Sequence, residues 1–124
     1  MQDTPIISIV DDDQSIRASL DDLVSSLGYV AHTFVSAEQF LESPQIETTS
    51  FLISDVQLPG FSGFELQQAL LKRGYTTPIL FITAYPSAAE ELRAISAGAM
   101  GILRKPLDNQ LLVENIEIAL KGPV

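Results

Sequence analysis

The hydrophobic residues of this chain gather into five short runs, each bounded by polar residues, glycine or proline. Runs of this length between turn signals are typical of strands buried on both faces, as in a parallel sheet. We therefore predict five strands, at Ile6–Val10, Tyr29–Phe34, Phe51–Asp55, Pro78–Thr83 and Met100–Leu103.

A helical pattern follows each predicted strand. After the first strand, Asp13 or Ser15 is suited to begin a helix and Gly28 is suited to end it. Between them, apolar residues recur at i, i+4, i+7, i+8 and i+11, which is one stripe of a helix. These residues are Ile16, Leu20, Leu23, Val24 and Leu27.

Capping signals mark the remaining helices. A serine followed three residues later by Glu or Gln predicts a capping box, and this pattern occurs three times. Pro44, Gly74 and Gly98 are suited to end the helices that follow these boxes, and residues 46–50 are interpreted as a polar connection. Asp108 is suited to cap the last helix. The boxes are Ser36 with Gln39, Ser62 with Glu65 and Ser87 with Glu90, and the apolar helix positions are Phe40, Leu41, Phe64, Leu66, Ala69, Leu70, Leu92, Ile95, Ala99, Leu112, Ile116, Ala119 and Leu120.

The element order is a strand followed by a helix, repeated five times. With apolar rather than alternating strands, this order predicts a parallel sheet covered by helices on both faces and joined by right-handed crossovers. The predicted fold class is α/β, a flavodoxin-like, doubly wound sheet of five strands in the order 2-1-3-4-5. No linker or repeat divides the chain, so residues 1–124 are predicted to form a single domain.

Composition and charge narrow the classes of function. The 124 residues carry a net charge of −9, include no cysteine and contain no apolar stretch of membrane-spanning length. A domain this acidic is a poor partner for nucleic-acid phosphates, so we expect no direct nucleic-acid contact and no membrane association. The N-terminus, Met1–Pro5, lacks the basic and apolar regions of a secretory signal, so the expected location is cytoplasmic.

Polar side chains stand at the predicted strand ends. Asp11 and Asp12 follow the first strand, Asp55 ends the third, Thr83 ends the fourth and Lys105 follows the fifth. In the order 2-1-3-4-5 the first and third strands are neighbours, so we expect the three carboxylates to meet in one crevice. One Lys offsets only part of their charge, and oxygen ligands without Cys or His favour Mg²⁺ as the remaining cation.

Two interpretations of Asp55 are compatible with its own segment. It begins the turn that contains Pro59 and Gly60, which is a common role for Asp. A carboxylate beside a metal ion is also suited to attack a phosphoryl group and form an aspartyl-phosphate, with Thr83 and Lys105 neutralising the phosphoryl oxygens.

The chain resembles a response-regulator receiver domain over essentially its whole length. The resemblance is carried by Ile9–Asp12, Ile53–Val56 with Leu58–Gly60 and Gly63, Ile82–Ala84, and Lys105–Pro106, which occur in this order at strand ends. The segment from Asp11 to Leu41, with Phe34, Ser36, Ala37 and Phe40, further resembles the FixJ-like branch, which usually carries a DNA-binding domain downstream.

The resemblance implies a set of roles. Asp55 would accept phosphate from a sensor histidine kinase, and Asp11, Asp12, Asp55 and the Gln57 carbonyl would hold Mg²⁺. Thr83 and Lys105 would contact the phosphoryl group, and the Lys105–Pro106 peptide would be cis. The output, often transcription, would pass through the face of helix four, strand five and helix five, commonly with a phosphorylation-dependent homodimer.

One position departs from the family pattern. Ile102 stands three residues before Lys105, where the family usually has an aromatic switch residue. Tyr85, two residues after Thr83, could gate the pocket instead, or could simply be a loop aromatic. The other candidate residues have plainer interpretations: Asp13 as a helix cap, His32 as structural, Phe81 and Met100 as core, and Arg104 as surface.

Four functions compete. The leading hypothesis is a phosphoacceptor signalling module that turns over no diffusible substrate. An Asp-x-Asp phosphatase would need a second Asp where Gln57 stands, and a flavin carrier would need a phosphate-binding loop where Asp11–Asp13 stand. A degenerate receiver acting as a phosphate-independent interaction module is the fourth. The ending, Lys121–Val124, is compatible with a natural stop or with a linker cut before an effector domain.

Overall fold

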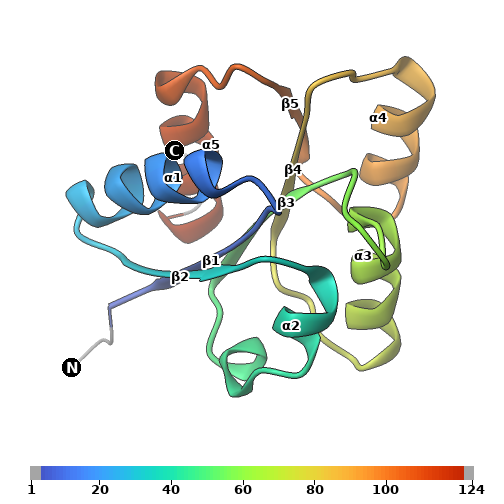
Figure 1. The fold of residues 1–124 in the computed structure, drawn as a ribbon, viewed down its shortest axis with the longest axis horizontal. Helices are drawn as coiled ribbons and strands as arrows, with labels where there is room; N and C mark the ends of the chain where they lie inside the picture. Colours follow the sequence, from blue (N-terminus) through green and yellow to red (C-terminus); the bar gives the residue numbers. More distant parts are fainter. Residues whose placement is uncertain (1–3, 122–124) are drawn as a thin grey trace.

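The computed structural model describes residues 4–121, so the expectations for Met1–Pro5 and Lys121–Val124 fall largely outside the described residues. Strands and helices alternate along this part of the chain (Figure 1). The strands are β1 Ile6–Val10, β2 Val30–Phe34, β3 Phe51–Asp55, β4 Ile79–Thr83 and β5 Gly101–Arg104. The helices are α1 Gln14–Ser26, α2 Ala37–Leu41, α3 Gly63–Lys72, α4 Ala88–Ser96 and α5 Asn109–Lys121, with a 3-10 helix, η1, at Pro44–Glu47.

The five strands form one parallel sheet in the order β2-β1-β3-β4-β5, which confirms the predicted flavodoxin-like topology. β1 pairs with both β2 and β3, with Ile9 opposite Thr33 on one side and Ile53 on the other. The chain leaves β1 toward β2 and later returns to β3 on the opposite side. This reversal places the carboxyl ends of β1 and β3 together at the switch point of the sheet.

Two apolar clusters cover the two faces of the sheet. α1 and α5 lie on one face, and α2, α3 and α4 lie on the other (Figure 1). Because successive strand side chains point to opposite faces, Ile7 and Ile9 enter the first cluster while Val10 enters the second. β3 and β4 are buried along their whole length, as their largely apolar sequences predict.

The predicted helix boundaries follow local chemistry. Asp13 begins α1, since its carboxylate accepts from the N–H groups of Ser15 and Ile16 at 2.8 and 3.3 Å. Ser62 with Glu65 forms a complete capping box. The other two predicted boxes are only half formed, because Ser36 and Ser87 accept the expected N–H but the reciprocal bond is missing. Helix-ending glycines adopt positive φ, and Asp108 caps α5 as predicted.

Three further features differ from the sequence prediction. The polar connection at residues 46–50 begins inside η1, where Ile46 is buried, and Thr49 is also buried. In α4 the residues at helical spacing point outward, with Leu92 and Ile95 exposed to 68% and 50%, and Ala94 takes the inward position. The edge strands β2 and β5 are only partly buried, because each has a neighbour on one side alone. None of the helices in residues 4–121 is long and apolar enough to cross a membrane.

Candidate functional site

The candidate site lies at the carboxyl ends of β1 and β3. Asp11 follows β1 directly, and Asp55 is the last residue of β3. The two strands are parallel and adjacent, and Val10 pairs with Ser54, so the two aspartates leave the sheet at the same edge. An Asp11 N–H bond to the Phe34 carbonyl, 3.1 Å long, continues the β1–β2 pairing and holds the Asp11 main chain in place.

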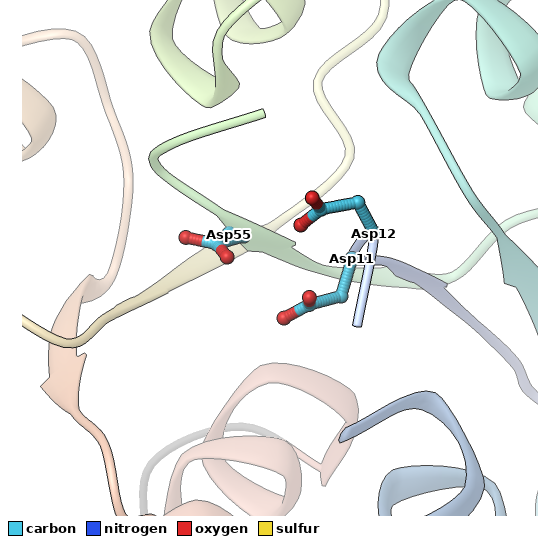
Figure 2. Close-up of side chains that lie close together, drawn as sticks. All are labelled: Asp11, Asp12 and Asp55. Carbon is cyan, nitrogen blue, oxygen red and sulfur yellow. The ribbon is translucent and has the colours of Figure 1, made fainter. Parts of the chain in front are cut away.

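Asp11, Asp12 and Asp55 form one carboxylate cluster (Figure 2). One oxygen from each residue lies within 4.8 Å of the others. Asp11 and Asp55 are buried, whereas Asp12 is exposed, so the cluster opens to solvent on the Asp12 side. The predicted meeting of the three carboxylates is confirmed.

Lys105 supplies a cation to this cluster. Its Nζ donates to Asp11 Oδ2 at 3.0 Å and to Asp55 Oδ2 at 2.9 Å. The other oxygen of each carboxylate accepts a main-chain N–H two residues onward: Asp11 Oδ1 from Asp13 at 2.8 Å, and Asp55 Oδ1 from Gln57 at 3.0 Å. Both buried carboxylates are therefore held in orientation at both oxygens.

Burial and neighbouring charge shift two pKa values in the cluster. Burial raises the pKa of Asp11, and the nearby Asp55 charge adds to the rise, although hydrogen bonds from Asp13 and Lys105 oppose it. Burial alone would lower the pKa of Lys105, but its hydrogen bonds to Asp55 and Asp11 and their charges more than offset this, so its pKa is raised. Lys105 is therefore protonated at neutral pH. A further cation nearby would stabilise the charged form of the Asp11 carboxylate.

Thr83 and Lys105 come from the neighbouring strand ends. Thr83 is the buried last residue of β4, and its carbonyl accepts the Lys105 N–H at 2.8 Å. The Thr83 hydroxyl accepts the Tyr85 N–H at 3.4 Å. The Lys105–Pro106 peptide is cis, which confirms that expectation. Ile102, at the expected aromatic position, is buried in the cluster that also contains Phe81.

The remaining sequence candidates lie where their plainer interpretations place them. Arg104 is exposed, His32 lies half-buried on β2, and Met100 packs on the edge of the core. Tyr85 is 77% exposed, so its gating role stays a prediction. Gln57 is exposed, and its N–H rather than its carbonyl contacts Asp55, so the role of that carbonyl also stays a prediction.

Sequence reasoning missed two residues of the site. Arg17 Nη1 donates to the Asp11 carbonyl at 2.7 Å and adds positive charge behind the cluster. A base near the amino end of a helix opposes the helix dipole, and this could have signalled an acidic neighbour. Gly63 was noted only as part of the motif, but its α-carbon faces the Asp55 carbonyl so closely that a methyl group would overlap it.

The donor set fits a hard divalent cation. Three carboxylates form the cluster, and Lys105 offsets one of their negative charges. Clustered carboxylate oxygens without a nitrogen or sulfur ligand are the donors that Mg²⁺ prefers. The open Asp12 side leaves room for water or substrate oxygens to complete the six-fold coordination that Mg²⁺ requires.

Comparisons with known proteins agree with this geometry. Residues 7–117 match the model of the response regulator receiver domain. The transcriptional regulatory protein TdiR of Thauera aromatica is 39% identical over 114 residues, which are 92% of this chain and 50% of TdiR. The transcriptional regulatory protein FixJ of Bradyrhizobium diazoefficiens is 31% identical over 115 residues, which are 93% of this chain and 56% of FixJ.

A solved structure gives the same result. The response regulator StyR superposes with a TM-score of 0.88 and 39% identity, over 96% of this chain and 60% of that one. The chain thus spans about half the length of the curated relatives it matches. Receiver domains are signalling domains of two-component systems, which pair with histidine kinases, and they are not conventional enzymes. By its sheet order, its strand-end residues and these matches, the chain belongs to the response regulator receiver domains, with FixJ among its relatives.

Proposed function

We propose that this domain is phosphorylated on Asp55 by a sensor histidine kinase in the presence of Mg²⁺. The observation that carries the proposal is the pair of contacts from Lys105 Nζ to Asp11 and Asp55, 3.0 and 2.9 Å long, inside the carboxylate cluster. A buried carboxylate that is oriented at both oxygens and lies beside a cation is preorganised to attack a phosphoryl group.

The transfer would occur in one displacement. An Asp55 oxygen attacks the phosphorus of a kinase phosphohistidine, the O–P bond forms as the N–P bond breaks, and the imidazole nitrogen keeps the bonding pair and takes a proton from solvent. Lys105 exchanges its hydrogen bond to Asp55 for one to a phosphoryl oxygen. Thr83 turns its hydroxyl away from the Tyr85 N–H and donates to a second phosphoryl oxygen. Both movements place donors where negative charge gathers.

Asp11, Asp12 and Asp55 would hold the Mg²⁺, with the Gln57 carbonyl as a further ligand. When bound, the ion would neutralise phosphoryl oxygens, as metal ions do in phosphoryl transfer. Asp12, the exposed member, contributes charge without being tied to Lys105. Asp11 is oriented by the Asp13 N–H, while the Asp13 carboxylate is committed to capping α1.

The output would pass through the face formed by α4, β5 and α5. Support comes from large apolar side chains that are exposed on α4 and α5, including Leu92, Ile95 and Ile118. Exposed apolar side chains are available for protein contacts, which suits a phosphorylation-dependent homodimer. We further propose that the domain is part of a longer cytoplasmic regulator of transcription whose DNA contacts belong to a separate C-terminal domain. The basis is that this chain matches only 50% and 56% of two relatives named as transcriptional regulatory proteins.

Acetyl phosphate with Mg²⁺, followed by intact mass measurement, tests the acceptor. We expect the wild type to gain one phosphoryl group and Asp55→Asn to gain none. Modification that persists in Asp55→Asn would exclude Asp55 as the acceptor.

Mg²⁺ titration with and without beryllofluoride, observed by NMR, tests the metal site. Asp12→Ala should weaken Mg²⁺ binding without unfolding the domain, because Asp12 is exposed and makes no contact with Lys105. Undiminished affinity would contradict the ligand assignment. A wild type with no Mg²⁺-dependent response would favour the alternative function, a degenerate receiver acting as a phosphate-independent interaction module.

A further inference from the structure

The loop between β3 and α3, residues 56–62, directly follows Asp55 of the carboxylate cluster. Main-chain bonds close its base: the Val56 N–H donates to the Ile82 carbonyl at 3.0 Å, and the Gly63 N–H donates to the Val56 carbonyl at 2.9 Å. Just inside this closure, the Gln57 N–H donates to Asp55 Oδ1. The placement of this N–H, and of the neighbouring Gln57 carbonyl, therefore depends on where the loop lies.

The tip of this loop is held by a side chain of α2. Glu38, in the first turn of α2, accepts the Phe61 N–H through Oε2 at 3.1 Å. At the adjoining Gly60, a methyl group would overlap the same Glu38 oxygen, and the φ of +75° is one that L-residues rarely adopt. The loop backbone therefore approaches the carboxylate more closely than any residue other than glycine would allow.

The second oxygen of Glu38 is an exception to normal polar pairing. Oε1 is buried, and within residues 4–121 it has no hydrogen-bond partner. Buried polar atoms are almost always paired, because an unpaired one loses its hydration without replacement. A neutral apolar residue at position 38 would avoid this loss but would leave the Phe61 N–H without its acceptor.

We propose that Glu38 is a positioning residue for the phosphorylation site. By binding the Phe61 N–H it holds the β3–α3 loop against α2, and the loop in turn sets the Gln57 main chain beside Asp55. Glu38 does not touch the reacting atoms. The inference rests on the proposed function, because it assigns Glu38 a part in Mg²⁺ binding and Asp55 phosphorylation.

The test compares Glu38→Ala and Glu38→Gln with the matched control Glu42→Ala, an exposed glutamate at the end of the same helix. Mg²⁺ affinity is measured by calorimetry and the phosphorylation rate with acetyl phosphate by intact mass. Residues that support metal ligands commonly change affinity by about tenfold when removed, so we expect a loss of about that size in Glu38→Ala. Glu38→Gln should restore most of it, because an amide oxygen also accepts the Phe61 N–H, and Glu42→Ala should match the wild type.

Two results would overturn the inference. One is wild-type Mg²⁺ affinity in a folded Glu38→Ala variant. The other is an equal loss of Mg²⁺ affinity in the Ala and Gln variants.

Exchange of the Phe61 amide, measured by NMR without Mg²⁺, gives a readout independent of the proposed function. This exchange should be faster in Glu38→Ala and nearly normal in Glu38→Gln. If the wild type bound no Mg²⁺, the proposed function would fail, while the amide exchange would still test the role of Glu38. Glu38→Asp, which keeps the charge but shortens the reach, serves if the Ala variant does not fold.

Discussion

Gly63, the first residue of α3, offers a test in which local and tertiary effects have opposite signs. Its φ is not in the left-handed region, so alanine fits the backbone there. Helix propensity alone would make Gly63→Ala stabilising by up to about 1 kcal/mol. The tertiary structure predicts the reverse, because a methyl group would overlap the Asp55 carbonyl and lie 3.0 Å from Phe81 Cε1 and 3.1 Å from Val56 Cα.

These neighbours cannot move freely. The Asp55 carbonyl accepts the Ser54 hydroxyl at 3.0 Å, the Val56 N–H is bonded to the Ile82 carbonyl, and Phe81 is fully buried. Inserting a methyl group into a packed site of this kind costs about 1–3 kcal/mol. After subtracting the gain in propensity, we expect Gly63→Ala to destabilise the domain by about 1 kcal/mol.

Urea unfolding observed by circular dichroism measures this difference, provided that the slope of free energy against urea stays constant. Gly74→Ala, just past the other end of α3, is the matched control. Its φ of +85° should cost about 1 kcal/mol, but a methyl group there meets no atom within 4 Å. Both variants should lose stability, but only Gly63→Ala should also weaken Mg²⁺ binding, because it displaces the Asp55 main chain. If Gly63→Ala were as stable as the wild type with normal Mg²⁺ affinity, this steric reasoning would be refuted.

Three further predictions concern other contacts. Lys105→Ala removes two charge-assisted hydrogen bonds and should lower the free energy of unfolding in urea by about 2–3 kcal/mol without Mg²⁺. Added Mg²⁺ should restore part of the lost stability, and equal stability of the variant with and without Mg²⁺ would contradict this prediction. Ser8→Ala removes a buried 2.7 Å hydroxyl pair with Thr49 and should cost about 1 kcal/mol, whereas an unchanged unfolding midpoint would show that the pair contributes nothing. Tyr85→Ala should leave stability within about 0.5 kcal/mol, since the side chain is exposed; if Tyr85 gates the pocket, the variant will change the phosphorylation or dephosphorylation rate, and two unchanged rates would end that hypothesis.

The sequence by itself determined the strands, the helix ends and the residue types at the strand ends. These depend on local features: uninterrupted apolar runs, a serine or aspartate that bonds the first N–H groups of a helix, and a glycine that adopts positive φ after the last turn. Asp13, Ser62 and Gly28 behave in the structure as their neighbours in sequence predict. The order of strands and helices then limited the fold to a doubly wound sheet, and this sheet order placed Asp11 beside Asp55.

The tertiary structure decided which atoms meet at close range. The strand order predicted Lys105 at the same edge of the sheet as Asp11 and Asp55, but only the packing sets its hydrogen bonds to both carboxylates. Glu38 and Phe61 lie 23 positions apart, and no local pattern encodes their contact. Burial is also a tertiary property. Leu92 is exposed although its spacing is typical of a core stripe, and Ile46 is buried although its segment is predicted to be a polar connection. Gly63 shows the same limit, since the reason for a glycine there is the Asp55 carbonyl, and the packing of α3 against β3 brings that atom close.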